Sequence, residues 1–134
     1  MRRKLKRERA PSLASLRRTA DDLWRKAVYQ AHPRCILCGR PAGPAHHFFP
    51  KKLYGHLRYD LDNGISLCIE CHFRHHTRGD PLIAQRIITT NGQDWYKRLL
   101  EKARQKPISF RSAGWYRKNI EQLRQLLADN YPSP

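Results

Sequence analysis

Four cysteines form two pairs, each with two residues between its members. The first pair is Cys35 and Cys38, and the second is Cys68 and Cys71. Two such pairs can hold one tetrahedral Zn²⁺, with each sulfur about 2.3 Å from the ion. The ion is expected to be structural, because four sulfur ligands leave no coordination position for a substrate. The 29 residues between the pairs exceed the roughly 15–20 of common zinc ribbons, so they must form structure of their own.

Two disulfides or a redox-active cysteine pair are the alternatives to zinc. The basic N-terminal arm, residues 1–10, is not followed by the apolar stretch that a secretory signal needs. We therefore expect a cytoplasmic protein with reduced thiols, which favours zinc over both alternatives.

Histidines gather around the cysteine pairs. Five of the seven are His46, His47, His72, His75 and His76. His72 and His76 are four residues apart, so on a helix they share one face and can bind one ion. His46 and His47 are adjacent on an expected strand, so their side chains point to opposite sides. One would join the metal, and the other would face outward to a substrate, where a pKa near neutrality lets it deprotonate an attacking water.

The dipeptide Asn63-Gly64 has two interpretations. It is a common turn sequence that needs no function. Alternatively, the side-chain amide of Asn63 bonds to backbone and fixes the loop that carries the outward histidine. Both interpretations stay open at the level of sequence.

The order and spacing of these residues resemble the HNH endonuclease family. Two Cys-x2-Cys pairs frame a His-His pair, an asparagine 16 residues after it and a further histidine 9 residues later. The resemblance covers roughly residues 35–77, about a third of the chain. Residues 57–64, LRYDLDNG, are similar in particular to stand-alone HNH nucleases of phage genomes.

The resemblance implies a ββα-metal fold, in which a two-stranded hairpin packs on a helix with one divalent ion between them. It implies that His46 and His72 are metal ligands, that His47 is the general base and that Asn63 orients this base. His76 lies where colicin-type members carry a further histidine ligand. His75 is a substitute for His76 on the same helix.

The identity of the catalytic metal depends on His46. Many HNH enzymes have aspartate at this position, a harder ligand that suits Mg²⁺. Histidine shifts the preference towards Mn²⁺, Ni²⁺, Co²⁺ or Zn²⁺. The expected cofactors are therefore structural Zn²⁺ and a catalytic divalent ion, which is Mn²⁺, Mg²⁺, Ni²⁺, Co²⁺ or Zn²⁺.

Basic residues outnumber acidic residues by 27 to 11, which gives a formal net charge of +16. Such an excess indicates a polyanionic partner, with nucleic acid as the first candidate and an anionic membrane surface as the second. The expected phosphate contacts near the histidines are Lys51, Lys52, Arg58, Arg74 and Arg78. Arg34, Arg40 and the arm at residues 1–10 would extend this surface.

The elements that must position these residues follow from hydrophobic periodicity, caps and breakers. Helices are expected at residues 12–32, 69–77, 80–91, 93–106 and 113–130, and short strands at 45–49 and 64–68. The predicted fold class is α+β, with a small ββα-metal core. A four-cysteine zinc site is expected to stabilise this core, and additional helices are expected to surround it. We expect one domain over residues 11–131, with its catalytic core at about 34–78.

The helix at residues 80–91 has the clearest boundaries. Asp80 is a capping carboxylate directly before proline at the first helical position, and Asn91-Gly92 ends the helix. Its apolar face is expected to contain Leu82, Ile83, Ile87 and Ile88.

Together these features predict a metal-dependent DNA endonuclease that hydrolyses phosphodiester bonds and nicks double-stranded DNA as a monomer, with little sequence preference. The phage-type resemblance implies phage DNA processing, such as packaging or recombination, in the host cytoplasm with terminase as a candidate partner. The alternative is a non-catalytic zinc-dependent DNA-binding module, which explains the charge and the cysteines but not the histidines. Membrane spans and solenoid repeats are not expected, because the chain has neither long apolar runs nor internal periods.

Overall fold

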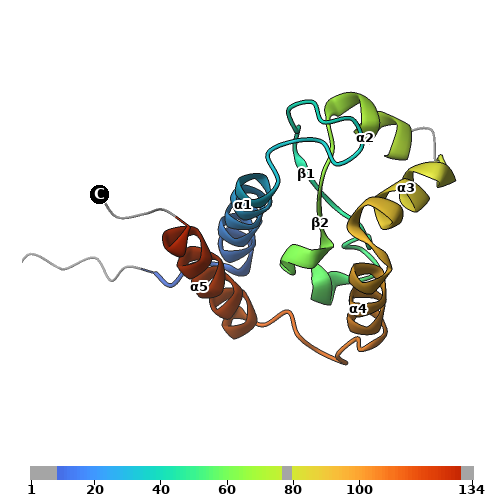
Figure 1. The fold of residues 1–134 in the computed structure, drawn as a ribbon. Coiled ribbons are helices and arrows are strands. Elements are labelled where there is room, and N and C mark those ends of the chain that lie inside the picture. The colour runs from blue at the N-terminus through green and yellow to red at the C-terminus, as the bar shows by residue number, and fades with distance from the viewer. Residues whose placement is uncertain (1–8, 77–79, 131–134) are drawn as a thin grey trace, which may run out of the picture.

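The computed structural model describes residues 9–76 and 80–130, except for the side chain of His76. Within this part, five helices surround one two-stranded hairpin (Figure 1), so the α+β class is confirmed. The elements are α1 (Leu13–Ala31), β1 (Ala45–His47), β2 (Gly64–Ser66), α2 (Ile69–His76), α3 (Pro81–Asn91), α4 (Gln93–Arg104) and α5 (Ala113–Asp129). The predicted contact Arg78 and most of the basic arm lie outside the described residues. No helix of the described part is long and apolar enough to cross a membrane.

Capping residues set the helix boundaries. The side chains of Ser12, Asp80 and Ser112 each accept a backbone N–H from the first turn of the helix that follows. Gly92 separates α3 from α4 with a φ of 95°, a conformation that glycine adopts without strain. The predicted helices are therefore confirmed to within one or two residues at most ends.

The hairpin is shorter than predicted. β1 and β2 pair in antiparallel register, with His46 opposite Ile65, and each strand has three residues instead of the five expected. The strand ladder ends after Phe48, whose N–H donates to the Asn63 carbonyl at 3.0 Å. The next N–H, that of Phe49, donates to the Asn63 side chain instead of to a strand.

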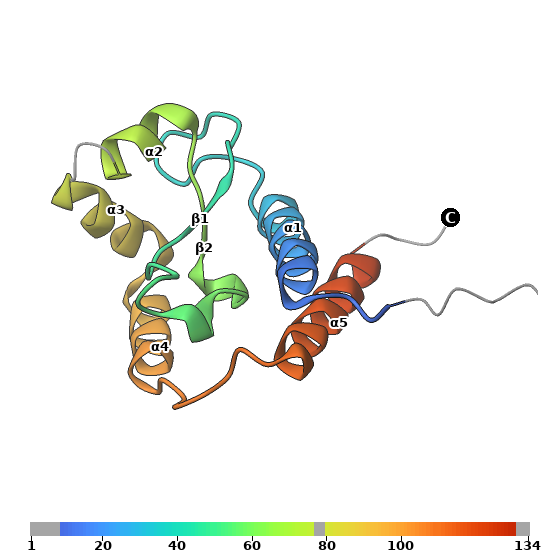
Figure 2. The same cartoon turned by 180° about the vertical axis from the view of Figure 1, so that it is seen from behind.

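Helices α1 and α5 lie on one side of the hairpin, and α3 and α4 lie on the other (Figures 1 and 2). The buried apolar residues form two clusters that follow this division. The α1–α5 cluster contains the buried residues Leu16, Ala20, Trp24, Ala27, Val28, Tyr59, Tyr116, Ile120 and Leu123. The hairpin–α4 cluster contains Cys35, Leu57, Ile65, Leu67, Cys68, Cys71, Ile83, Ile87, Trp95, Leu99 and Ala103. The two strands thus lie between two separate packing units.

The apolar face of α3 is narrower than predicted. Ile83 and Ile87 are buried, and Ile88 packs partly against the hairpin–α4 cluster. Leu82, however, is 60% exposed. Residues 83 and 87 are one turn apart and share a face, whereas residue 82 is rotated about 100° away from that face.

Gly64 allows β2 to approach α1 closely. A Cβ atom on this residue would collide with Val28 and would lie 3.2 Å from the ring of Trp24. A side chain at this position would push the hairpin away from α1. The contact matters for the site, because it brings β1 next to Trp24.

Candidate active site and metal centre

The first cysteine pair lies in a tight turn between α1 and β1. The Cys35 N–H donates to the Arg40 carbonyl at 2.7 Å, and the Gly39 N–H donates to the Cys35 carbonyl at 3.0 Å. Gly39 has a φ of 73°, so the chain reverses direction directly after Cys38. The turn holds both cysteines next to β2, because the Ile36 N–H donates to the Ser66 carbonyl at 2.9 Å.

The second cysteine pair begins α2, directly after β2. The Cys71 N–H donates to the Cys68 sulfur at 3.4 Å, and the His72 N–H donates to the Cys68 carbonyl at 2.9 Å. Cys68 therefore takes the N-cap position, with sulfur in place of the usual oxygen. A metal ion bound to this pair would fix the first turn of α2.

The four sulfur atoms lie within 4.8 Å of one another, and all four thiols are free of disulfides. A tetrahedral Zn²⁺ would place its sulfurs about 3.8 Å apart, close to the 3.5 Å between Cys38 and Cys68. Burial and the neighbouring sulfurs raise the pKa of the Cys71 thiol to about 12. Burial of Cys35 is outweighed by backbone N–H bonds, which lower its pKa to about 7. A cation would stabilise the four adjacent thiolates, so spacing and donor type both fit zinc.

Two of the predicted basic residues stabilise the turn that contains Cys35 and Cys38. Arg34 donates from Nη1 to the Gly39 carbonyl at 3.1 Å. Arg40 forms an ion pair at 2.9 Å with Glu70 of α2. Both side chains are thus partly engaged within the protein.

His46 on β1 and His72 on α2 come together. Their ring centroids are 3.7 Å apart, and the ring planes meet at 62°. Two imidazoles that converge from a strand and a helix are suited to hold one divalent ion. His76 belongs to the same helix, but its side chain lies outside the described part, so a third ligand stays a prediction. His75 is partly buried on α2.

His47 projects to the other side of β1 from His46, as predicted, but it faces α1 and not solvent. Its ring stacks on Trp24, with centroids 4.0 Å apart and planes at 4°. Nε2 lies 2.8 Å from the Arg58 carbonyl oxygen. Because a carbonyl only accepts, Nε2 carries the proton and Nδ1 keeps its lone pair.

The predicted near-neutral pKa of His47 is wrong. Burial, with a smaller contribution from the charges of Lys51 and Arg58, lowers this pKa to about 4. The stacked indole of Trp24 removes water from one face of the ring, which disfavours the charged form. At pH 7 the imidazole is therefore neutral and its Nδ1 can accept a proton.

Asn63 is fully buried and pins the loop that follows His47. Its side-chain oxygen accepts the Phe49 N–H at 2.8 Å. Its amide nitrogen donates to the carbonyls of Phe49 and Leu57, at 3.1 and 3.3 Å. The structure therefore supports the second interpretation of Asn63-Gly64, in which the Asn63 side chain fixes the backbone of the loop after His47.

Arg58 is held by an ion pair with α1. Its Nε and Nη2 donate to the two Asp21 oxygens at 2.9 and 2.8 Å, and the Tyr59 hydroxyl donates to the same carboxylate at 3.0 Å. Burial alone would raise the pKa of Asp21, but the bond and the charge of Arg58 outweigh it and hold the pKa below 3.8. This pair anchors the residue whose carbonyl fixes the His47 tautomer.

Sequence reasoning missed Trp24 and Asp21 as parts of this site. Trp24 belongs to the apolar stripe of α1, and no local pattern indicates that it stacks on a histidine far along the chain. Asp21 offered a weak signal, because Asp21 and Asp22 are the only acidic residues of α1. Acidic residues in an otherwise basic helix often have a specific partner.

The other predicted phosphate contacts divide into exposed and paired residues. Lys51 and Lys52 are exposed. Arg74 lies 3.7 Å from Glu70 on the same helix, so its charge is partly offset. Arg78 lies outside the part that the structure describes.

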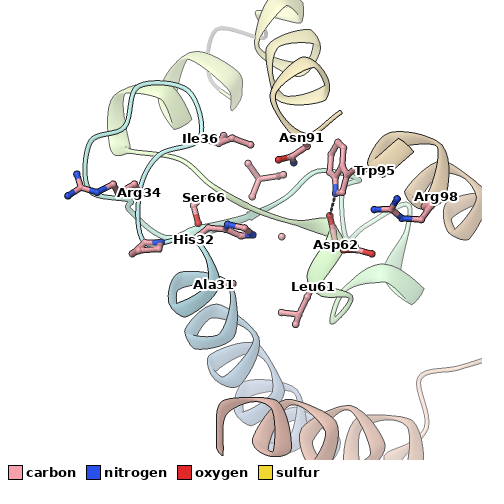
Figure 3. A pocket seen from close by; sticks show the side chains of 13 residues that line it. Ala31, His32, Arg34, Ile36, Leu61, Asp62, Ser66, Asn91, Trp95 and Arg98 are labelled. Carbon is pink, nitrogen blue, oxygen red and sulfur yellow. Dashed lines mark hydrogen bonds between the residues drawn. The ribbon is translucent and has the colours of Figure 1, made fainter. Parts of the chain in front are cut away.

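A pocket of about 470 Å³ lies along β2, between the end of α1 and the helices α3 and α4 (Figure 3). His32, Arg34, Trp95 and Arg98 are among its lining residues. Trp95 donates its Nε1 hydrogen to the Asp62 carbonyl at 2.9 Å, the dashed line in Figure 3. No candidate catalytic histidine lines this pocket, so it is separate from the site described above.

Residues 35–78 match the family model described as HNH endonuclease. The resemblance is thus confirmed over the segment that contains both cysteine pairs, the hairpin and α2. Comparisons with curated proteins and with solved structures each gave no match. An HNH domain implies nuclease activity on DNA with a divalent metal, and the cysteine cluster suggests bound zinc.

Proposed function

We propose that the protein is a metal-dependent endonuclease that hydrolyses phosphodiester bonds of DNA at His46, His47 and His72. One observation carries this proposal: adjacent residues of β1 turn to opposite sides, one to meet His72 and the other to present a neutral imidazole. A metal-binding pair beside a neutral base is a combination that can catalyse phosphodiester hydrolysis. The net charge of +16 supports a polyanionic substrate.

His47 is the proposed general base. Its Nδ1 would take a proton from a water molecule that attacks the phosphorus atom. The bond from Nε2 to the Arg58 carbonyl would orient the ring and stabilise the imidazolium that forms. Asn63 is the proposed positioning residue, because it holds the backbone directly after His47.

His46 and His72 would hold the catalytic ion, with His76 as the proposed third ligand. When bound, the ion would supply Lewis-acid stabilisation of the charge that develops on the phosphate and the leaving 3′ oxygen. Nitrogen ligands favour Mn²⁺, Ni²⁺, Co²⁺ or Zn²⁺ over Mg²⁺. The structural zinc would act indirectly, because it fixes the first turn of α2 and therefore His72.

We expect nicks in double-stranded DNA, because a monomer with one site cuts one strand at a time. We also expect little sequence preference, because phosphate contacts carry no base information. The proposed phosphate contacts are Lys51, Lys52, Arg58, Arg74 and Arg78.

Supercoiled plasmid tests the proposal, because nicked and linear products separate on a gel. With Mn²⁺ or Mg²⁺ present, we expect nicked circles that EDTA prevents. His47→Ala is expected to lower the cleavage rate by about 10²–10⁴. The matched control is His32→Ala, a change of an exposed histidine at the end of α1, which should cleave at the native rate.

Two outcomes would contradict the proposal. If His47→Ala keeps its zinc and binds DNA but cleaves at the native rate, His47 is not the base. If the native chain binds DNA but cleaves it with none of the five metals, the protein is a zinc-dependent binding module. Sequencing of the product ends would reveal a strict cut site, which would overturn the expected low specificity.

We place this activity in phage DNA processing, such as packaging or recombination, in the host cytoplasm. The support is an interpretation of the sequence, the resemblance of residues 57–64 to stand-alone HNH nucleases of phage genomes. Terminase is then the proposed partner. Purified terminase should increase plasmid cleavage by the native chain, and an unchanged rate would contradict the partnership.

A further inference from the structure

A second pocket, of about 450 Å³, adjoins the candidate site. Its lining residues are Arg17, Lys51, Lys52, Gly55, Arg58, Arg111, Trp115 and Tyr116. Five of these eight are basic and none is acidic. Cations gathered around a concave surface concentrate their field there and attract anions.

The pocket is assembled from parts of the chain that are far apart in sequence. Arg17 comes from α1, Arg111 precedes α5, and residues 51–58 follow β1. Only residues 51–58 fall within the segment that matches the HNH family model. Helix α1 and the segment before α5 therefore add basic residues that the family segment does not contain.

The guanidinium of Arg111 lies against Gly55, where a side chain would leave it no room. A Cβ atom on Gly55 would lie 2.5 Å from Nη2 of Arg111 and 3.2 Å from Cζ of Phe110. The Arg111 guanidinium carbon also lies 5.3 Å from the centre of the Phe110 ring, within range of a cation–π contact. The guanidinium therefore rests over bare backbone against an aromatic ring.

One of the five cations is already balanced, because Arg58 pairs with Asp21. That pair uses two of the five N–H donors of the guanidinium. Among the described residues, no carboxylate lies within ion-pair distance of Arg17, Lys51, Lys52 or Arg111. The pocket thus keeps an excess of positive charge.

Arg58 connects this pocket to the candidate site. Its side chain lines the pocket, while its carbonyl oxygen lies 2.8 Å from Nε2 of His47. An anion in the pocket would therefore be bound by the side chain of a residue whose backbone contacts the proposed base.

We propose that this pocket binds a backbone phosphate of the DNA, next to the phosphate that is cleaved. Arg111 and Arg17 are its ligands from outside the HNH segment, with Lys51 and Lys52 beside them. The inference rests on the proposed function for the identity of the polyanion. A phosphate held there would set which bond of the strand reaches His46 and His47.

The test measures binding of a fluorescent DNA duplex to the full chain carrying His47→Ala, without added catalytic metal, so that cleavage is negligible during the measurement. Arg111→Gln is expected to weaken binding about tenfold, since it removes a charge-assisted bond. It should also reduce the slope of log affinity against log salt by about one. Gly55→Ala keeps every charge but displaces the guanidinium, and should weaken binding severalfold.

Two controls make the result specific. Arg124→Gln removes the same charge from an exposed position of α5 outside the pocket and should bind within twofold of the parent. Adding Gly55→Ala to Arg111→Gln should cause little further loss, because both changes act on one contact. Circular dichroism checks that each variant is folded.

The proposal is overturned if Arg111→Gln binds the duplex as tightly as its parent, or no more weakly than Arg124→Gln. It is also overturned if inorganic phosphate competes at the concentration at which the duplex binds, since the pocket would then bind free phosphate. These results are independent of cleavage. If Arg111→Gln loses DNA binding but the native chain has no nuclease activity, the phosphate pocket is supported and the proposed function is rejected.

Discussion

Residues from three parts of the chain fix His47. Trp24 of α1 covers its ring, the backbone carbonyl of Arg58 accepts a hydrogen bond from Nε2, and Asn63 holds the backbone that follows. Asp21 adds a further layer, because it anchors Arg58 and Tyr59 to α1. A base held in this way keeps one tautomer and one orientation, which proton transfer from a positioned water requires.

Asp21→Asn tests the anchor through its pH dependence. The Asp21–Arg58 side chains are only 18% and 19% exposed, so at pH 7 the change should lower the free energy of unfolding by about 2 kcal/mol. The folded protein lowers the pKa of Asp21 below its ordinary 3.8. The ionised carboxylate therefore stabilises the fold fully above about pH 4, and this contribution disappears as pH falls through the lowered pKa.

Urea unfolding followed by circular dichroism between pH 7 and pH 3 measures this difference. The groups that interact with Asp21 are the charged Arg58 and Arg25, the neutral Tyr59 hydroxyl, and His47, whose pKa is lowered to about 4. The control is Asp22→Asn, whose carboxylate is 67% exposed in its pair with Arg25 and should change stability by less than about 0.5 kcal/mol. A constant difference between the native chain and Asp21→Asn down to pH 3 would contradict the prediction.

Among the elements, α2 is expected to depend most on bound zinc. It has eight residues, too few for a stable isolated helix, and its N-cap is the sulfur of Cys68, one of the four clustered cysteines. The same element carries His72. We therefore expect zinc binding, helix formation and the position of His72, the proposed ligand of the catalytic ion, to be coupled within this short segment.

Cys38→Ser tests this coupling at the most exposed of the four ligands. We expect loss of bound zinc, a fall of several kcal/mol in the free energy of unfolding, and loss of cleavage. Hydrogen exchange should accelerate in α2 and the hairpin, while amides of α1 and α5 stay protected, because the α1–α5 cluster contains no cysteine. Zinc content is measured by metal analysis. Equal exchange in α2 of the native and variant chains would refute the coupling.

The sequence predicted elements better than it predicted contacts. Asp80, Pro81 and Gly92 mark their helix by local chemistry, so its boundaries were predictable. The opposed directions of His46 and His47 followed from strand geometry alone. The burial of His47 was not predictable, because Trp24 reaches it only when Gly64 lets β2 touch α1. The exposure of Leu82 likewise depends on how much of α3 its neighbours cover.

At the scale of the whole molecule, some basic residues form ion pairs within the protein and others do not. Arg40 and Arg74 lie near Glu70, and Lys102 bonds Asp60 and Asp62. The basic pocket beside His47 keeps an excess of positive charge. Part of the net charge of +16 is therefore concentrated in a basic pocket next to the candidate site, where four of the five cations have no described carboxylate partner.

Binding of the full chain to duplex DNA should weaken steeply with salt. If the basic surface neutralises four or five phosphates, log affinity should fall against log salt with a slope of about −4. Fluorescence anisotropy between about 50 and 200 mM salt measures this slope. A scrambled duplex of equal length should give the same slope and affinity. A slope near zero would show that the charge does not contact the backbone.

The two adjacent histidines of β1 belong to different packing units. His46 meets α2 on the side of the hairpin–α4 cluster, whereas His47 lies on Trp24 of the α1–α5 cluster. A substitution within one unit disturbs its own histidine first. Under the proposed roles, metal preference would depend on one packing unit and base strength on the other, so we expect substitutions to change each without loss of the other.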